Sequence, residues 1–286
     1  MRILITGANG MLGRALAARL ASGHTLLLWG REEADVTDES SVRRASNGIE
    51  FDAVVHAAAY TDVDRCESDE EAALRVNRDG VRHVAALARD RGARFVAVST
   101  DYVFDGAKAT PYGEDDPTAP INAYGRTKLA GEQAALASGA AALVVRTSWL
   151  FGPGGTNFVD TIAGKLERGE ALEVVNDQHG SPTYTRDLAH GIGRLLGRGA
   201  TGIVHVTNSG ATTWYDFAIA IARRIGSSAT IAPVSSSRFV RPARRPAHSV
   251  LGGERYRSLV GEPLPPWEEA LQHYLTVRAS APGAAA

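Results

Sequence analysis

The chain has almost no cysteine and no long apolar run. Its single cysteine, Cys66, cannot form an internal disulfide, and the charged residues around it lack the spacing of metal ligands. The apolar start, residues 3–5, is too short for a signal peptide, and no later apolar run is long enough to span a membrane. These absences exclude a disulfide-stabilised miniprotein and predict a cytoplasmic protein that neither enters nor crosses a membrane.

An excess of charge is also missing. The 286 residues include 31 Lys and Arg against 32 Asp and Glu, for a formal net charge of -1. Such a balance gives no bulk electrostatic reason to bind nucleic acid, so an anionic ligand must be met by a local site. No group of His or carboxylate residues has metal-ligand spacing. We therefore expect neither a nucleic-acid partner nor a metal.

What is present is a regular alternation of apolar, strand-like blocks with helix-like segments. The expected strands are residues 3–6, 25–29, 53–56, 95–99, 143–146, 173–175 and 203–206. The expected helices are residues 12–20, 70–89, 123–137, 158–168 and 188–196. This alternation predicts an α/β fold with a Rossmann-type doubly wound parallel sheet, whose ligands bind beyond the carboxyl ends of the strands.

A glycine-rich loop follows the first expected strand directly. Gly7, Gly10 and Gly13 have the spacing G-x-x-G-x-x-G, and the loop opens into a helix. Gly7 permits a tight turn, Gly10 lets backbone approach a pyrophosphate, and Gly13 lets the helix pack on the strand. A loop that merely needs positive φ is the plainer interpretation, but its position between strand and helix favours a dinucleotide site.

The domain organisation follows from this loop and from glycine and proline, which become denser after about residue 150. We expect residues 1–150 to form an NAD(P)-binding Rossmann domain to which residues 185–206 return. Residues 151–184 and 207–280 are expected to form a smaller α/β substrate-binding lobe. Residues 281–286 are expected to be a disordered tail.

The end of the second strand indicates which dinucleotide is bound. An acidic residue there would select NAD through the ribose 2′-hydroxyl, but the chain has Arg31. A cation favours NADPH, whereas a merely solvated surface arginine is the alternative interpretation. NADH remains the alternative cofactor because Glu32, Glu33 and Asp35 follow closely.

Hydroxyl and amine side chains follow the fourth strand. Thr100 stands at its end, and Tyr124 and Lys128 lie four residues apart at the start of an expected helix, so they share one face. An unperturbed tyrosine has a pKa of about 10. A nearby ammonium favours the phenolate, so we expect Lys128 to lower the pKa of Tyr124 and make it a usable acid–base. A solvated helix face is the alternative, but the order of the three motifs favours a catalytic site.

In this order the motifs resemble the extended short-chain dehydrogenase/reductase superfamily and, within it, the dTDP-4-dehydrorhamnose reductase family. The similarity runs from residue 1 to about 275. Its more specific segments are Ser-Thr-Asp-Tyr-Val-Phe-Asp-Gly at 99–106 and Asn-Asp-Gln-His-Gly-Ser-Pro-Thr at 176–183. The glycine loop, Asn77 and segments 35–38, 56–64, 120–132 and 146–149 also belong to it.

The resemblance implies NADPH-dependent reduction of the C4 ketone of dTDP-4-dehydro-L-rhamnose to dTDP-L-rhamnose, the last step of dTDP-rhamnose biosynthesis. It implies that Tyr124 gives a proton to the C4 alkoxide, that Thr100 hydrogen-bonds the same oxygen and that Lys128 holds the nicotinamide ribose. The implied cofactor-binding residues are Gly7, Asn9, Gly10, Met11, Leu12, Gly13, Arg31, Asp35, Val36, Ala57, Ala58, Ala59, Tyr60, Tyr124 and Lys128.

A dTDP-4-keto-6-deoxy sugar is the implied substrate. The residues expected to bind it are Thr100, Asp101, Tyr102, Trp149, Asn176, Gln178 and Thr183. Tyr102 and Trp149 are the aromatic surfaces expected near the sugar or base, while the amides and hydroxyls could instead cap loops. His56 is either a strand-end core residue or a cleft contact. The arginines of 241–245 either pair with the diphosphate or belong to a solvated loop.

Assembly and alternative activities complete the expectations. Members of this family that dimerise through magnesium carry a carboxylate near the start of the first helix, where this chain has Ala15, so a monomer or weak homodimer is expected. The alternatives are another nucleotide-sugar 4-ketoreductase, an epimerase or dehydratase of the same fold, and a non-catalytic regulatory subunit. A dehydratase needs an acidic pair, but Asp101 is followed by Tyr102. The intact Thr100, Tyr124 and Lys128 favour catalysis.

Overall fold

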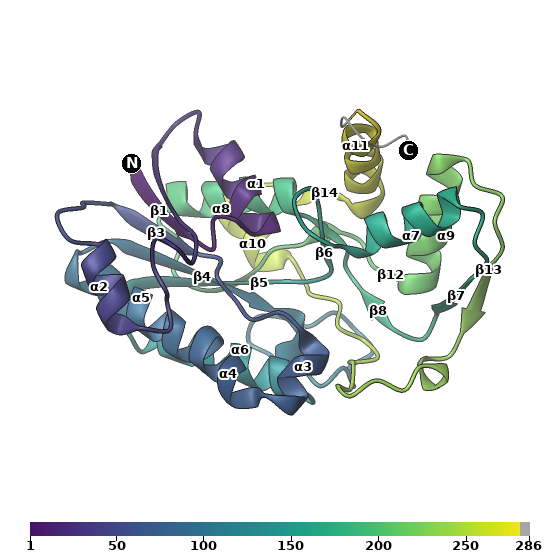
Figure 1. Cartoon of the computed structure of the whole chain (residues 1–286), viewed down its shortest axis with the longest axis horizontal. Helices are drawn as coiled ribbons and strands as arrows, with labels where there is room; N and C mark the ends of the chain where they lie inside the picture. The colour runs from purple at the N-terminus through teal and green to yellow at the C-terminus, as the bar shows by residue number, and fades with distance from the viewer. Residues whose placement is uncertain (281–286) are drawn as a thin grey trace.

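A six-stranded parallel sheet forms the centre of the computed structural model, which describes residues 1–280 (Figure 1). The strand order is β10-β5-β4-β3-β1-β2. The strands are β1 (Arg2–Thr6), β2 (Thr25–Trp29), β3 (Ala53–His56), β4 (Arg94–Thr100), β5 (Ala141–Thr147) and β10 (Gly202–His205). The predicted doubly wound parallel sheet is confirmed.

Helices cover both faces of this sheet (Figure 1). Along β1, Ile3 and Ile5 pack into one core and Leu4 into the other, because successive side chains of a strand point to opposite faces. The first face is covered by α1 (Met11–Leu20), α8 (Thr185–Arg198) and α10 (Glu254–Val260). The second is covered by α2 (Glu39–Ala45), α5 (Val81–Asp90) and α6 (Ala123–Leu136).

The single helix predicted over 70–89 is wrong in its middle. The structure has α4 (Glu70–Leu74), a π-helical segment η1 (Arg75–Gly80) and then α5, and the short α3 (Val63–Ser68) precedes them. Within η1, the buried Asn77 carboxamide accepts from the Tyr60 N–H at 2.8 Å and donates to the Thr127 hydroxyl at 3.0 Å. A π-helical insertion re-aims one turn of a helix, and here it turns Asn77 toward its partners.

A second, smaller body has its own hydrophobic core (Figure 1). Its helices are α7 (Phe158–Glu167), α9 (Trp214–Ile225) and α11 (Trp267–Ala279). The strand predicted over 173–175 forms here as β7 (Leu172–Val175), paired with β13 (Ile231–Val234) and not with the main sheet. Further pairs join β6 (Leu150–Phe151) to β9 (Thr183–Tyr184), β8 (His179–Gly180) to β12 (Thr212–Thr213), and β11 (Asn208–Ser209) to β14 (Leu264–Pro266). Two 3-10 turns, η2 (Asp101–Val103) and η3 (Ser236–Arg238), complete the elements of residues 1–280.

The boundaries of the two bodies cross the chain more than once. β10 lies beside β5 in the large sheet, and Tyr256, Val260 and Leu264 also pack into the core on that sheet's first face. The expected division into a Rossmann domain and a substrate-binding lobe therefore stays a prediction, with α10 packed on the sheet side. The predicted tail, 281–286, lies outside the described residues. Within 1–280, no helix combines the length and apolarity needed to span a membrane.

Helix α6 lies unusually close to η1, and Gly131 makes this approach possible. A Cβ at position 131 would lie 2.1 Å from the Asn77 carbonyl oxygen, a backbone atom that cannot yield alone. We expect Gly131→Ala to lower the free energy of unfolding by about 1–3 kcal/mol through overpacking. Urea unfolding monitored by circular dichroism would measure the loss.

Gly164→Ala is the matched control for this prediction. Gly164 also lies inside a helix, α7, but its Cβ would meet only the flexible Arg168 side chain, at 3.6 Å. Replacing a helical glycine by alanine without a clash should raise stability by about 0.5–1 kcal/mol. If both variants gain stability, α6 does not depend on Gly131 for its approach to η1.

Candidate active site

A pocket of about 500 Å³ lies at the carboxyl ends of β1, β2 and β3. Of the predicted cofactor-binding residues it brings together Gly7, Gly10, Arg31, Asp35, Val36, Ala57, Ala58, Ala59 and Tyr60. The sequence analysis missed six further lining residues, Gly30, Ala34, Thr37, Ala72, Arg75 and Val76. Arg75 and Val76 come from the π-helical segment, which no periodicity argument had identified.

The glycine loop fits the pyrophosphate of a dinucleotide. Gly7 has φ of +70°, and a Cβ there would lie 2.5 Å from the Ala58 backbone nitrogen. Helix α1 begins after Gly10 with no side-chain cap, so its first N–H groups can meet an anion. A Cβ at Gly13 would lie 2.2 Å from the Gly7 carbonyl oxygen, which explains glycine where helix and loop touch.

The other glycine-loop residues that were predicted to bind the cofactor do not line this pocket. Leu12 is buried in the core beneath the sheet, so any contact from it to a cofactor is through its backbone. The Asn9 side chain lies against Gly30, where a Cβ would be 2.3 Å from its nitrogen. Cofactor contacts by Asn9, Met11 and Leu12 stay predictions.

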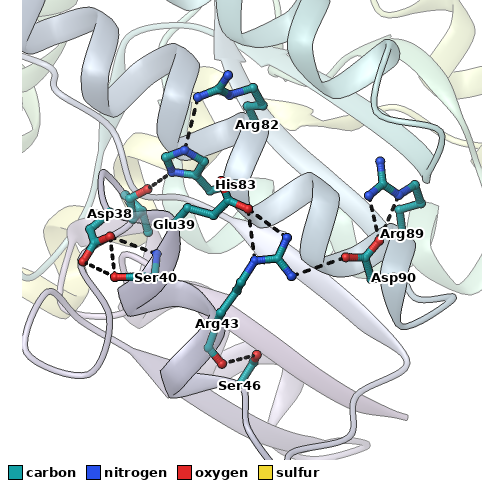
Figure 2. A network of polar contacts seen from close by, with 10 residues as sticks. Asp38, Glu39, Ser40, Arg43, Ser46, Arg82, His83, Arg89 and Asp90 are labelled. Atoms are coloured by element: carbon teal, nitrogen blue, oxygen red, sulfur yellow. Dashed lines mark hydrogen bonds and ion pairs between the residues drawn. The ribbon is translucent and has the colours of Figure 1, made fainter.

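The segment 35–38 at the adenosine end of the pocket is held by a polar network. The Asp35 carboxylate accepts from the Thr37 N–H at 3.0 Å and hydroxyl at 2.7 Å, which lowers the pKa of Asp35. The buried His83 ring lies 2.9 Å from the Val36 carbonyl oxygen. Around it, Asp38 caps α2 and Arg43 bridges α2 to α5 (Figure 2).

Arg31 lies at the rim of this pocket, where it can reach a ligand. Its side chain is 89% exposed, and its nearest carboxylate oxygen, on Asp35, is 3.7 Å away. A weak, exposed pair of this kind leaves the guanidinium available to a phosphate.

The three predicted catalytic residues converge where β4 ends against α6. The Thr100 hydroxyl donates to Asp101 Oδ1 at 3.0 Å and lies close enough to Tyr124 to favour its ionised form. Asn122 caps α6 and so fixes the turn that carries Tyr124. One turn later, the buried Lys128 ammonium donates to the Val98 carbonyl oxygen at 2.7 Å. The predicted shared face of Tyr124 and Lys128 therefore points toward the end of β4.

The expected effect of Lys128 on Tyr124 needs correction. Desolvation raises the pKa of Tyr124, and the nearby Asp101 adds to the rise. The Lys128 ammonium faces Val98, and burial lowers its own pKa to about 8, opposed by Glu132. Tyr124 thus keeps its proton at neutral pH, which suits a proton donor better than a proton acceptor.

Asp101 is the second buried acid of this cluster. Desolvation raises the pKa of Asp101 to about 6, opposed by the hydroxyls of Ser249 and Thr100. Within residues 1–280, no group forms a hydrogen bond with its Oδ2. An acid of this kind changes its charge just below neutral pH, beside the tyrosine.

The sequence analysis missed a buried ion pair that lies close to Lys128. Glu132 accepts from Arg146 Nε at 2.9 Å and Nη2 at 2.7 Å, and from the Ser99 hydroxyl at 2.5 Å. The Arg146 guanidinium also lies 5.1 Å from the centre of the Phe104 ring. Glu132 follows Lys128 by four residues on α6, so its spacing was the available signal, but its partner Arg146 is on β5.

His56 is a strand-end core residue, the first of its two expected alternatives. It is buried, and its Nδ1 lies 2.8 Å from the Thr6 hydroxyl. Desolvation lowers the pKa of His56 to about 3, so the ring is neutral at physiological pH. It therefore adds no charge beside Lys128.

Trp149 is half-buried, and part of its indole is covered by neighbouring residues. Its ring stacks on Trp214 with centroids 3.4 Å apart and planes 5° from parallel. The Gly180 backbone packs against the same indole, since a Cβ at 180 would lie 2.3 Å from its Cε2 atom. A contact of Trp149 with a substrate stays a prediction.

The other predicted substrate residues differ in accessibility. Thr183 is fully buried and its hydroxyl donates to the Ser181 carbonyl oxygen at 3.2 Å, so it holds the loop and has no surface for a ligand. Asn176 is exposed and Gln178 half-buried, and their contacts with substrate stay predictions. Arg245 is not free for a diphosphate, because both terminal nitrogens bind Asp64.

A protein-family model described as the RmlD substrate binding domain matches residues 1–279. The chain belongs to this family. This match confirms the resemblance inferred from the motifs. Among RmlD-family relatives, a protein of Streptomyces antibioticus named as a probable dTDP-4,6-dihydroxy-2-methyloxan-3-one 4-ketoreductase is 47% identical over 277 residues, covering 95% of this chain and 94% of that protein.

Two further relatives carry the reductase name. The dTDP-4-dehydrorhamnose reductase of Mycolicibacterium smegmatis is 44% identical, covering 95% of this chain and 84% of that protein. The solved structure of a dTDP-4-dehydrorhamnose reductase from Bacillus anthracis in complex with NADP is 36% identical with a TM-score of 0.93, covering 96% of this chain and 99% of that one.

We expect the buried Glu132–Arg146 pair to contribute more to the free energy of unfolding than an ion pair at the surface. Glu132→Gln leaves a buried guanidinium without its counter-charge, so we expect the free energy of unfolding to fall by about 3–5 kcal/mol. Chemical denaturation measures it. Glu70→Gln is the control, since Glu70 also receives two hydrogen bonds from an arginine, Arg126, but at the surface. That change should cost about 0–1 kcal/mol. Equal losses would contradict the ranking.

Proposed function

We propose that this chain is an NADPH-dependent reductase of the 4-keto group of dTDP-4-keto-6-deoxy sugars. Its preferred substrate is dTDP-4-dehydro-L-rhamnose, and its product is dTDP-L-rhamnose. The observation that carries the proposal is the convergence of Thr100, Tyr124 and Lys128 where β4 meets α6, next to a pocket built for a dinucleotide. Its relatives' reductase names agree with this chemistry.

The pocket residues can hold the cofactor in one orientation. Gly7 and Gly10 lie where a pyrophosphate needs close backbone approach, and Arg31 lies at the end where a 2′-phosphate would be. NADPH, when bound, supplies the hydride that reduces the carbonyl carbon.

The chain's own residues supply the proton. Tyr124 gives its phenolic proton to the carbonyl oxygen as that oxygen gains negative charge, and the Thr100 hydroxyl hydrogen-bonds the same oxygen. The raised pKa of Tyr124 keeps the proton in place at neutral pH until the oxygen becomes basic. One turn further along α6, Lys128 is the residue that would hold the nicotinamide ribose.

A second substrate is favoured by a specific observation. The relative that is 47% identical is named for a different dTDP-linked 4-keto sugar. Because a pocket that tolerates a single methyl or hydroxyl change is hard to detect from sequence, such a substrate is the second candidate. We also propose a cytoplasmic location, supported by Cys66, which is free and buried. The proposed monomer or weak homodimer is supported by Ala15, which stands where magnesium-linked dimers carry a carboxylate.

The decisive experiment offers the purified protein NADPH and dTDP-4-keto-L-rhamnose made in place from dTDP-glucose by a dehydratase and an epimerase. Loss of NADPH absorbance together with dTDP-L-rhamnose in the product analysis supports the proposal. Omitting the epimerase is the control, because the D-configured 4-keto sugar then accumulates. Faster oxidation without the epimerase would mean that the D-configured 4-keto sugar is preferred over the proposed substrate. No oxidation with either sugar overturns the proposed activity.

Tyr124→Phe removes the donated proton and little else. We expect kcat to fall at least about a thousandfold, near the range attributed to general acid catalysis. The Kd for NADPH, measured by fluorescence titration, should change less than about twofold because the ring still packs. A variant with ordinary kcat would remove Tyr124 from the mechanism.

Arg31→Ala tests the cofactor preference. Loss of a charge-assisted contact to the 2′-phosphate should raise the Kd for NADPH about tenfold and leave the Kd for NADH nearly unchanged. Arg78→Ala is the control, since Arg78 is also a partly exposed arginine but pairs with Asp79 and does not line the pocket. Equal weakening of both cofactors would make Arg31 a bystander.

A further inference from the structure

Residues 241–249, here named the strap, tie the C-terminal part of the chain to α3. Arg245 donates to both carboxylate oxygens of Asp64, with Nη1 2.5 Å from Oδ1 and Nη2 2.9 Å from Oδ2. The Ala243 N–H donates to the same Oδ1 at 3.2 Å. The side chains of Arg245 and Asp64 are only 16% and 29% exposed, so water competes weakly for this two-point contact.

The strap also contacts the start of α6. The Asn122 side chain, which caps that helix, donates to the Arg244 carbonyl oxygen at 2.7 Å. Gly106, with φ of +78°, lies so close to the strap that a Cβ would be 2.5 Å from Pro246. The strap therefore meets the same helix turn that carries Tyr124.

Tyr102 packs against Tyr124, and the charge of Arg245 acts on its phenol. Burial raises the pKa of Tyr102, and the charge of Arg245 opposes that rise. The Tyr102 ring meets the Tyr124 ring edge-on, with centroids 5.8 Å apart and planes at 79°. The Tyr102 carbonyl oxygen would lie 2.1 Å from a Cβ at Gly125, so the backbone at Tyr102 packs directly on the first turn of α6, which carries Tyr124.

We propose that Asp64 and Arg245 are positioning residues for the reduction: their ion pair holds the strap against the Asn122 cap of α6 and so fixes the helix turn that carries the Tyr124 phenol. The inference rests on the proposed role of Tyr124 as proton donor. It differs from a diphosphate-binding role for Arg245, because in that role Asp64 competes with the ligand, whereas here Asp64 and Arg245 act together.

Arg245→Gln and Asp64→Asn separate these roles. Positioning predicts that each variant lowers kcat about tenfold, with KM for the sugar nucleotide and Kd for NADPH changed less than about threefold. Diphosphate binding predicts opposite effects on KM, higher for Arg245→Gln and unchanged or lower for Asp64→Asn. That opposite pattern, or unchanged kcat in both, overturns the proposal. Asp64→Asn is isosteric and carries the test alone if Arg245→Gln does not fold.

Arg278→Gln is the matched control for lost stability. Arg278 makes the same contact with Glu167, at 2.5 and 2.9 Å with side chains 22% and 42% exposed, but it joins α11 to α7 away from Tyr124. It should lower the melting temperature about as much as Arg245→Gln and leave kcat unchanged. An equal fall in kcat in Arg278→Gln would mean that any loss of stability of this size lowers kcat, and the proposal would fail.

Hydrogen exchange completes the test. In Asp64→Asn, amide exchange across 241–249 should accelerate about tenfold or more, since the Ala243 N–H loses its charged acceptor. If amide exchange across 241–249 is unchanged in Asp64→Asn, Asp64 does not hold the strap in place. If the unmodified protein oxidises no NADPH, the proposed function fails, while the exchange result still decides whether Asp64 fastens the strap.

Discussion

The site depends on how closely α6 is held between its neighbours. A Cβ at Gly125 would lie 2.1 Å from the Tyr102 carbonyl oxygen, and one at Gly131 would lie 2.1 Å from that of Asn77. Six residues separate these glycines, so they lie on different sides of the helix and both sides are in backbone contact. Tyr124 and Lys128 occupy the turns between and beside these contacts. Their positions are therefore fixed by backbone packing, before any side-chain hydrogen bond is considered.

Burial then decides the charges at this position. It raises the pKa of Tyr124 and lowers that of Lys128, so both groups are pushed toward their neutral forms. Glu132 offsets the second effect, and its bond to Arg146 prevents a lone carboxylate from being buried. The neutral His56 adds no competing charge. A protonated tyrosine beside a lysine that is still mostly charged at neutral pH can give up a proton and tolerate the resulting anion.

The sequence was informative wherever local pattern and long-range structure coincide. The six strands of the large sheet are apolar runs because both faces are covered, so their positions could be predicted. Tyr124 and Lys128 share a helix, so their spacing alone placed them together. The Glu132–Arg146 pair, the Asp64–Arg245 pair and the Trp149–Trp214 stack each join segments distant in sequence, and no periodicity encodes them. Segment η1 was missed because residues 70–89 were treated as one helix, although η1 contains the poor helix formers Asn77, Asp79 and Gly80.

The surroundings of Trp149 show the same limit of sequence reasoning. Trp149 has φ of +48°, which is unfavourable for a residue with a large side chain, and within 1–280 no other non-glycine residue has a positive φ. Its conformation is held by Trp214 from α9 and by the absence of a side chain at Gly180. A sequence shows an aromatic residue but not which of its surfaces other residues have covered. For this reason the proposed substrate contacts, which come from segments distant in sequence, were harder to predict than the spacing of Tyr124 and Lys128 on one helix.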